Sequence, residues 1–486
     1  MAKNIVVLGG GTAGWLTALF CNQTFPTASV TLIENTAIGA VGVGEGSSLA
    51  LPQFLDKLGI DSLQVMKESN GSVKTGISFE NWNGDSKKYF HSFRGEDVFS
   101  IPPHFPGGCD AYHMQTLIKN GLDVNEHIYA TRLAYCNKLD FELPMAMHFD
   151  AYKFATCLKN IAKERGIVCV DGNCSHVEVD ENNFIEKICL DGGIDFACDF
   201  AFDCSGFARL LIGGYYQTAW TDYQDFLPMK KAITFRLDVE EEIKPYTQSI
   251  AMGYGWMWKI AIQDRIGSGY VFDSDYLNEE DAVAEAEKIL GQKLDSIHSI
   301  PFNAGTYQKF WVQNCISVGL SSTFVEPLEA TSIDVIITQL DMLKGFVNHI
   351  FKYDENSVDS YNRGVCERVE LVSHFIYVHY LTKRNDTEFW RTFKERHPAP
   401  KKFERLLRLL YQNNLRESDF GFLPYTFRQI DWLEICNGLE LFEKPMDMDG
   451  YENLTPSIDE YKEWCDARIS SPDVVSCSDF LREVRG

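Results

Sequence analysis

The chain has 486 residues, of which 45% are hydrophobic, and its formal net charge is −24 at pH 7. This length allows a large core and two or three packed regions. The negative charge argues against nucleic acid or an anionic membrane surface as partner, because both require a basic field. No run of about 18 apolar residues predicts a membrane span. The 14 cysteines show no metal-ligand spacing, so we expect free thiols in a reducing cytoplasm and no metal site.

The first 35 residues have the pattern of a βαβ unit. NIVVL (4–8) predicts a strand, the following run to about residue 25 predicts a helix, and SVTLIE (29–34) predicts a second strand. Glu34 ends that second strand, where a carboxylate can hold a ribose hydroxyl. An acid at this place favours an adenosine without a 2′-phosphate, as in NAD or FAD.

Three glycines connect the first strand to the helix. Gly9, Gly11 and Gly14 fit the motif G-x-G-x-x-G. The first allows a tight turn, the second lets the backbone approach a pyrophosphate, and the third lets the helix pack close to the strand. In its strand–helix–strand context the motif predicts a bound dinucleotide. The alternative is a tight turn without a ligand.

A second glycine-rich segment follows, AIGAVGVGEGS (37–47). Gly42, Gly44 and Gly46 surround Glu45 there. Such a loop would let the chain lie along an extended flavin cofactor, and the alternative is a flexible surface loop.

The segment NGSVKTGISFENW (70–82) alternates apolar and polar residues. Val73, Thr75 and Ile77 would share one face of a strand and Lys74 would point the opposite way. Taken alone, the pattern favours a solvent-facing lysine.

Further along the chain, HFDAYKFATCLKNIAKERG and VCERVELVSHFIYVHYL have helical periodicity. Between them, GWMWKIAIQDRIGSGYVF (255–272) reads as strand-like and is broken by Gly267 and Gly269. Because residues i and i+2 of a strand point to one face, Trp256 and Trp258 would form one wall. Large core residues are the alternative interpretation.

Glu329 precedes a run with helical spacing, ATSIDVIITQLDMLKGFVNHIF. An acid is favourable at a helix N-terminus on electrostatic grounds alone. The same helix start offers free backbone N–H groups.

Several of these segments together resemble the flavin-dependent tryptophan halogenase family. GGGTAGW, GVGEGS, HFDA, DCSG, W-x-W-x-I with GSGYVF, and CISVGLSSTFVEPLEATSI occur in the family's order over residues 4 to 380. Three positions depart from the family pattern: Ala261 replaces a proline, Ala330 a serine and Ser332 a glycine.

The resemblance implies a mixed α/β flavoprotein, Rossmann-like in its FAD-binding part and of the flavoprotein-monooxygenase type. We expect one interleaved unit of three regions: an FAD region from about 1–50, 150–210 and 300–350, a substrate region from about 70–150 and 210–300, and a helical C-terminal region from about 355–486.

The resemblance also implies the site residues. Lys74 and Glu329 would be catalytic, with the lysine acting as a cation or as a haloamine. The implied FAD contacts are Gly9, Gly11, Thr12, Ala13, Gly14, Glu34, Gly44, Glu45, Gly319 and Ser332. Thr331 and Ser332 would bind halide, and the substrate would meet His91, Phe93, Trp256 and Trp258.

The expected activity is that of a two-component halogenase in which a separate reductase supplies reduced FAD, because a second nucleotide motif is not found. The co-substrate would be chloride, bromide or iodide, and the substrate a small electron-rich aromatic. Free tryptophan is disfavoured, because FRQIDWLEICNGLELFEKP does not match the family's amino-acid clamp. Free or carrier-tethered substrate, regiochemistry and oligomeric state are left open. The alternatives are a flavin monooxygenase and a flavin-binding protein without this chemistry.

Overall fold

The computed structural model describes residues 2–38, 44–93, 110–420, 426–446 and 456–485. Its N-terminal region is built on a six-stranded sheet whose neighbours are parallel except at one edge. In spatial order the strands are β21 (Trp311–Val312), β22 (Cys315–Ser317), β13 (Phe200–Asp203), β1 (Asn4–Leu8), β2 (Ser29–Glu34) and β9 (Val168–Asp171). The two strands expected near the N-terminus are confirmed.

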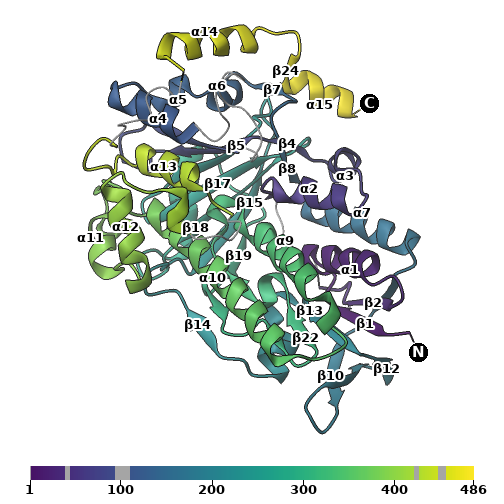
Figure 1. Ribbon diagram of the computed structural model, residues 1–486. Helices are drawn as coiled ribbons and strands as arrows, with labels where there is room; N and C mark the ends of the chain where they lie inside the picture. The colour runs from purple at the N-terminus through teal and green to yellow at the C-terminus, as the bar shows by residue number, and fades with distance from the viewer. Residues whose placement is uncertain (1, 39–43, 94–109, 421–425, 447–455, 486) are drawn as a thin grey trace.

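Helices cover this sheet. The helix α1 (Thr12–Thr24) packs against β2 and against α7 (Ala151–Glu164) and α9 (Thr331–Leu343), as Figure 1 shows. The expected helices after HFD and after Glu329 are confirmed, although the second becomes the 3-10 helix η5 (Lys344–His349) after residue 343.

A seven-stranded sheet forms the second layer of the molecule. Its order is β19 (His298–Pro301), β15 (Lys231–Leu237), β18 (Ile266–Phe272), β17 (Gly255–Ala261), β16 (Thr247–Ala251), β5 (Gly76–Glu80) and β6 (Lys88–Ser92). The pair β16–β5 is parallel and the other pairs are antiparallel. The stretch 255–272 is therefore a hairpin that turns between residues 261 and 266. Gly267 and Gly269 lie inside β18, so our expectation that they break the strand is wrong.

The strand expected around Lys74 is divided in two. β4 (Ser72–Lys74) joins β3 (Glu45–Gly46) and β8 (Ala146–Phe149) in a small sheet, whereas β5 begins at Gly76 in the large one. The break is at Thr75, whose N–H and hydroxyl both donate to the carbonyl of Pro245, at 2.7 and 2.8 Å. Lys74 is thus the last residue of β4 in the small sheet, and β5 of the large sheet begins two residues later.

Smaller elements complete the described chain. The other strands are β10 (Cys174–Val179), β11 (Ile185–Leu190), β12 (Ile194–Ala197), β14 (Trp220–Asp222), β20 (Gly305–Tyr307), β23 (Thr323–Phe324), β7 (Lys138–Asp140) and β24 (Val474–Ser476). The other α-helices are α2 (Ala50–Lys57), α3 (Ser62–Glu68), α4 (Asp110–Lys119), α5 (Val124–His127), α6 (Tyr129–Tyr135), α8 (Glu279–Leu290), α10 (Glu355–His379), α11 (Glu388–Arg396), α12 (Glu404–Tyr411), α13 (Gln429–Gly438), α14 (Ile458–Ile469) and α15 (Cys477–Arg485). Short helical turns are η1 (Gly206–Ala208), η2 (Leu210–Tyr215), η3 (Gly319–Ser321), η4 (Pro327–Glu329), η6 (Lys401–Phe403) and η7 (Glu417–Phe420).

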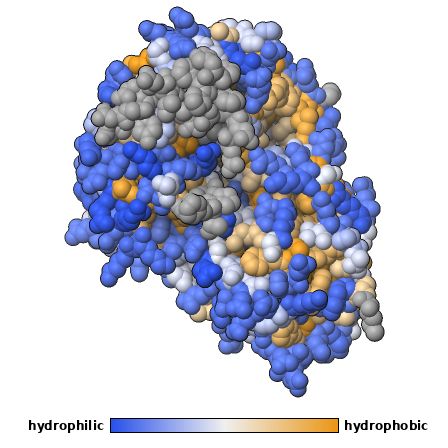
Figure 2. Space-filling model, viewed as in Figure 1, coloured by the Kyte–Doolittle hydropathy of each residue, from blue (hydrophilic) through white to orange (hydrophobic). Residues whose placement is uncertain are grey.

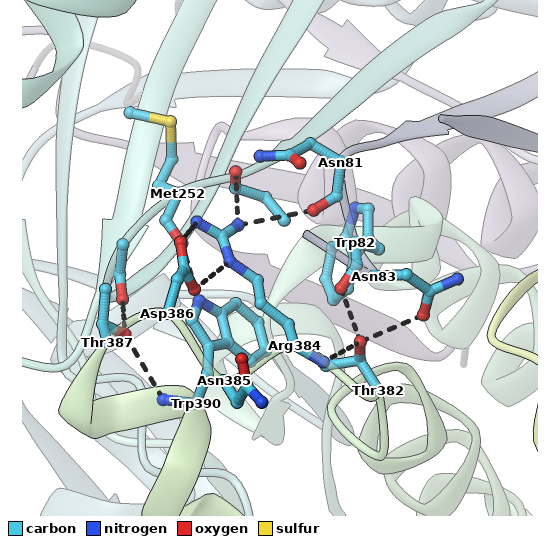
Figure 3. Close-up of polar contacts among 12 residues, drawn as sticks. Asn81, Trp82, Asn83, Met252, Thr382, Arg384, Asn385, Asp386, Thr387 and Trp390 are labelled. Atoms are coloured by element: carbon cyan, nitrogen blue, oxygen red, sulfur yellow. Dashed lines mark hydrogen bonds and ion pairs between the residues drawn. The ribbon is translucent and has the colours of Figure 1, made fainter. Parts of the chain in front are cut away.

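The C-terminal end of α10 is anchored to the seven-stranded sheet by a buried arginine (Figure 3). Arg384 donates to the carbonyl of Ala251 at 2.8 Å and pairs with Asp386 at 2.7 Å. Two residues earlier, the Thr382 hydroxyl donates to the carbonyl of Trp82 at 2.5 Å. These bonds fix the position of the last turn of α10, which contributes two side chains to the site.

The surface seen in Figure 2 is mainly hydrophilic, and hydrophobic residues gather there in smaller patches. Among the described residues, we find no helix that combines the length and hydrophobicity needed to cross a bilayer.

Candidate active site

The glycine turn after β1 has the geometry that a dinucleotide requires. Gly9 has φ +125°, and a Cβ there would lie 2.1 Å from the carbonyl oxygen of Cys204. A Cβ on Gly14 would lie 1.8 Å from the carbonyl oxygen of Gly9. At Gly11, by contrast, a Cβ would meet no heavy atom within 4 Å, so open space lies before the start of α1. Thr12 and Ala13 begin this helix, and its first turn carries no acid.

Glu34 lies directly against this turn. A Cβ on Gly10 would come within 2.2 Å of the Glu34 carboxylate. Oε1 of Glu34 accepts a hydrogen bond from Lys159 on α7 at 2.5 Å. The carboxylate is thus oriented at the end of β2, beside the open space, where a ribose hydroxyl would be bound.

Of the two further segments predicted to contact FAD, one packs against α1 and the other lies beside the hairpin of β17 and β18. Gly319 has φ +74°, and a Cβ there would lie 2.8 Å from the Cβ of Ala13, so this glycine lets η3 pack against α1. Gly44 has φ +127° and lies next to Gly267. Burial, and then the charge of Asp150, raise the pKa of Glu45 to about 7. Gly42 lies outside the described residues.

Lys74 is enclosed rather than solvent-facing, with 1% of its surface exposed. Its Nζ donates to the carbonyl oxygen of Ser47 at 3.1 Å and lies 4.7 Å from the ring centre of Phe93. Burial lowers the pKa of Lys74 to about 7, and the negative charge of Glu329 opposes that shift. An amine with this pKa exchanges protons readily at neutral pH.

Glu329 is buried between two histidines and is 2% exposed. Its Oε2 lies 2.8 Å from Nδ1 of His91, and its Oε1 lies 2.9 Å from Nε2 of His379 on α10. Burial by itself would raise the pKa of Glu329, but the charges and hydrogen bonds of these histidines lower it to about 2. The group is therefore a carboxylate at neutral pH.

The rings of His91, in β6, and Phe93, directly after it, lie 6.0 Å apart between their centres. The far nitrogen of His91, Nε2, lies 3.2 Å from Oδ1 of Asp431 on α13. Burial tends to lower the pKa of His91, but Glu329 and Asp431 together raise it to about 10. Both ring nitrogens of His91 are thus occupied by acids, and Phe93 is the more exposed of the two rings.

The start of α9 brings the predicted halide residues to the site. Ala330 has a left-handed backbone (φ +57°), which ends η4 and lets the helix begin at Thr331. Thr331 is buried, and its hydroxyl has no hydrogen-bond partner among the described residues. Ser332 is half-buried in the same first turn. A helix N-terminus with an unused hydroxyl suits a small anion.

Trp256 and Trp258 lie on one face of β17, with ring centres 6.0 Å apart, as the strand periodicity predicts. Gly269 faces Trp258 across the hairpin, and a Cβ there would lie 2.2 Å from the indole. Because Gly269 has no side chain, it leaves room for the indole of Trp258. Trp256 donates from Nε1 to Oε2 of Glu326 at 2.7 Å.

Sequence reasoning missed several residues of this site. They are Gly10, Ser47, Glu326, His379, Tyr380, Asp431 and Glu434. Glu326 lies only three residues before Glu329 in EPLE, and this spacing was the one available signal. The remaining polar residues lie in helical or loop segments whose pattern predicts only packing.

Comparison with known proteins decides the family. The tryptophan halogenase profile matches residues 4–450. The chain belongs to the tryptophan halogenase family. It is 30% identical to the tryptophan 6-halogenase SttH of Streptomyces toxytricini, over 88% of each chain. It is 33% identical to the tryptophan 7-halogenase RebH of Lentzea aerocolonigenes, over 80% of this chain and 78% of that one.

Solved structures of the family agree. A flavin-dependent halogenase from Xanthomonas campestris superposes with a TM-score of 0.89 at 26% identity, covering 100% of this chain and 98% of that one. BrvH from Brevundimonas sp. BAL3 gives 0.86 at 28% identity over the whole of both chains. The protein is therefore a flavin-dependent halogenase, an oxidoreductase that uses reduced FAD and halide. The open space at Gly11 and the orientation of Glu34 fit this cofactor.

Proposed function

We propose that this enzyme halogenates an electron-rich aromatic carbon by means of hypohalous acid that Lys74 and Glu329 hold and activate. The observation that supports this proposal is that two groups of opposite charge, Lys74 and Glu329, are both buried. Lys74 is 1% and Glu329 2% exposed, and the charge of Glu329 acts on the lysine. An ammonium and a carboxylate kept away from water are suited to polarise a small electrophile and to accept a proton.

Each group has a defined part in the proposed reaction. Reduced FAD, when bound, supplies with oxygen the oxidising equivalents that convert halide into hypohalous acid. The Lys74 ammonium donates a hydrogen bond, and then a proton, to the oxygen of hypohalous acid. The ring carbon takes the halogen as the oxygen–halogen bond breaks, and water leaves. The Glu329 carboxylate accepts the proton that the ring carbon loses, which restores aromaticity. Glu329 then gives up this proton and the Lys74 amine regains one, so the net products are the aryl halide and water.

Other residues keep the reactants apart. The indoles of Trp256 and Trp258 form a wall that keeps the aromatic substrate from the flavin, so that halide is oxidised in its place. Thr331 and Ser332 bind the halide through the start of α9. Phe93 offers a flat surface to a flat substrate, beside the Lys74 ammonium.

We infer that the substrate is an indole or a phenol without a free amino-acid carboxylate. The support for this inference is the segment FRQIDWLEICNGLELFEKP, which does not match the family's amino-acid clamp. A separate flavin reductase is the proposed partner, because the sequence carries one dinucleotide motif.

The test uses purified protein with FAD, NADH and a flavin reductase. Chloride, bromide or iodide is added separately to a panel of indoles and phenols, and mass spectrometry identifies the products. The variants are Lys74→Met and, as a matched control, Lys259→Met. Lys259 is a half-buried lysine of β17 that pairs with Glu240 at 2.6 Å.

Mass shifts that follow the added halide, disappear in Lys74→Met and persist in Lys259→Met support the proposal. Products that gain only oxygen would favour the monooxygenase alternative. Reduced flavin consumed without any product would favour a protein that binds flavin without this chemistry.

A further inference from the structure

A group of metal-ligating side chains lies outside the candidate active site, on the three-stranded sheet of β10, β11 and β12 at the lower end of Figure 1. His176, Glu178 and Cys189 bring a nitrogen, an oxygen and a sulfur within 4.8 Å of one another. The proposed halogenation uses none of these residues. We propose that His176, Glu178 and Cys189 bind a zinc ion. This inference does not rest on the proposed function.

The register of the strands brings the three residues to one face of this sheet. His176 of β10 stands opposite Cys189 of β11, and Glu178 follows two residues later on the same face of β10. Between them, Val177 pairs with Ile188, and both pack in a hydrophobic core on the other face. Linear spacing gives no sign of the group, because the pairing of β10 with β11 brings its members together.

Ser175 orients the histidine for a metal. Its hydroxyl donates to the carbonyl oxygen of Cys189 at 3.0 Å and lies 3.0 Å from Nδ1 of His176. The hydroxyl has a single proton, so both contacts are hydrogen bonds only when Nδ1 carries a proton of its own. Nε2 then keeps its lone pair, and we assign it as the ligand nitrogen. A hydrogen bond at the other ring nitrogen is the usual way in which proteins orient a metal-binding histidine.

The charges around the group suit a divalent ion. Lys187 donates to Oε2 of Glu178 at 2.6 Å, which leaves Oε1 for the metal. Asp195 of β12 stands opposite Cys189 and acts on its thiol, so a second carboxylate lies next to the sulfur. A thiolate, one carboxylate and a neutral imidazole balance the two positive charges of the ion. The Asp195 carboxylate and the Lys187 ammonium balance each other.

The ligand types fit zinc rather than calcium or magnesium. Zinc takes cysteine sulfur, histidine nitrogen and carboxylate oxygen, whereas calcium and magnesium prefer oxygen. Tetrahedral bonds of about 2.0 to 2.3 Å set neighbouring ligand atoms roughly 3.3 to 3.5 Å apart. His176 and Glu178 are exposed, so rotation of their side chains can close the remaining distance. Cys189 releases its thiol proton to solvent as the metal–sulfur bond forms.

The first experiment titrates Co²⁺, a spectroscopic substitute for zinc, into the reduced full-length protein after chelator treatment. Tetrahedral cobalt with a thiolate ligand absorbs in the visible range and has a sulfur-to-metal band in the near ultraviolet. The variants are Cys189→Ser, His176→Gln and, as a matched control, Cys174→Ser. Cys174 lies on the same strand as His176 and donates from Sγ to the His176 carbonyl at 3.7 Å, but it packs against the hydrophobic core.

We expect one equivalent of Co²⁺ that stays with the wild type and with Cys174→Ser through gel filtration and that Zn²⁺ displaces. The sulfur-to-metal band should be absent from Cys189→Ser, and His176→Gln should bind Co²⁺ at least about 10-fold more weakly. His176 is exposed, so its variant tests the site even if Cys189→Ser does not fold. The proposal is overturned if the wild type lacks the band or loses its cobalt on gel filtration, or if Cys189→Ser retains the band.

A second measurement determines the zinc content of protein prepared without a histidine tag, after incubation with Zn²⁺ and gel filtration. We expect one zinc per chain in the wild type and in Glu186→Gln, whose exposed glutamate on β11 lies outside the group. Glu178→Gln should retain less zinc, because an amide is a weaker ligand than a carboxylate. Equal zinc in Glu178→Gln and the wild type would refute the proposed ligand set. Neither readout involves halogenation, so failure of this proposal is distinguishable from failure of the proposed function.

Discussion

Trp256 and Glu326 are joined by a buried hydrogen bond of 2.7 Å between the indole Nε1 and the carboxylate Oε2. The hydroxyl of Tyr380 donates to the same oxygen at 2.5 Å. The other oxygen, Oε1, has no partner among the described residues. Glu326, three residues before Glu329, thus links Trp256 of β17 to the end of α10.

The first prediction concerns the charge of Glu326. Burial raises its pKa to about 7, although the bonds from Tyr380 and Trp256 oppose this. The folded protein therefore binds the proton more tightly than the unfolded chain, and the stabilisation is lost as pH rises from 4.5 through 7. Glu326→Gln keeps the acceptor and has no charge. Its Tm relative to wild type should increase between pH 5 and pH 8, and a constant difference would contradict the shift.

The second prediction concerns the wall itself. Glu326→Leu leaves the Trp256 N–H and the Tyr380 hydroxyl buried without an acceptor, which costs about 1 to 3 kcal/mol for each group. We expect a looser wall and less halogenated product per NADH consumed, whereas Glu326→Gln retains the coupling ratio. Product and NADH are measured in the same reaction. Equal ratios in both variants would show that the wall does not depend on this bond.

Much of this arrangement follows from the sequence. The two N-terminal strands, the glycine turn and the pairing of Trp256 with Trp258 on one face depend on local periodicity or on a contiguous motif. These features need no knowledge of distant segments. Gly269 is an exception: its local pattern indicates a break in the strand, whereas its cross-strand pairing with Trp258 explains why a glycine stands there.

The environment of the proposed catalytic groups could not be predicted in this way. Lys74 reads as solvent-facing because its burial depends on Ser47 and Phe93, which reach it from other segments. His91 meets Asp431 across 340 residues of sequence and Glu329 across 238. No periodicity within β6 encodes such contacts. The predicted continuous strand fails at Thr75 for the same reason, since the bond acceptor is Pro245.

The third prediction is that the lysine reduces stability. Lys74 has a folded pKa of about 7 against 10.5 for the free side chain. The unfolded state binds more protons over that range, so wild-type stability rises between pH 7 and 10.5 and the cost is greatest below pH 7. Lys74→Met should raise Tm by about 2 to 5 °C at pH 6.5, and this advantage should shrink towards pH 10. A destabilised Lys74→Met would contradict the prediction, with Lys259→Met as the reference.

The fourth prediction tests the space for Trp258. A Cβ at position 269 would lie 2.2 Å from the indole and 2.6 Å from the carbonyl oxygen of Ile233. The carbonyl of Ile233 belongs to the backbone and cannot move aside as the end of a flexible side chain can. Gly269→Ala should therefore destabilise the fold by roughly 1 to 3 kcal/mol. Denaturant unfolding measures this change. Gly345→Ala is the control, because a Cβ there meets no atom within 4 Å. Equal stability of the two variants would show that β18 accommodates the methyl group.

The last prediction separates halide binding from stability at the start of α9. The buried hydroxyl of Thr331 makes no hydrogen bond in the described structure, so its replacement by a methyl group of the same shape removes an unsatisfied polar group. Thr331→Val should therefore unfold at an equal or higher temperature than the wild type. If the hydroxyl donates to halide, the same variant should raise the KM for bromide about 5- to 10-fold at an unchanged Kd for FAD. Thr331→Ser, which keeps the hydroxyl, should restore the bromide KM. A variant that lowers Tm and leaves the bromide KM unchanged would place the halide elsewhere.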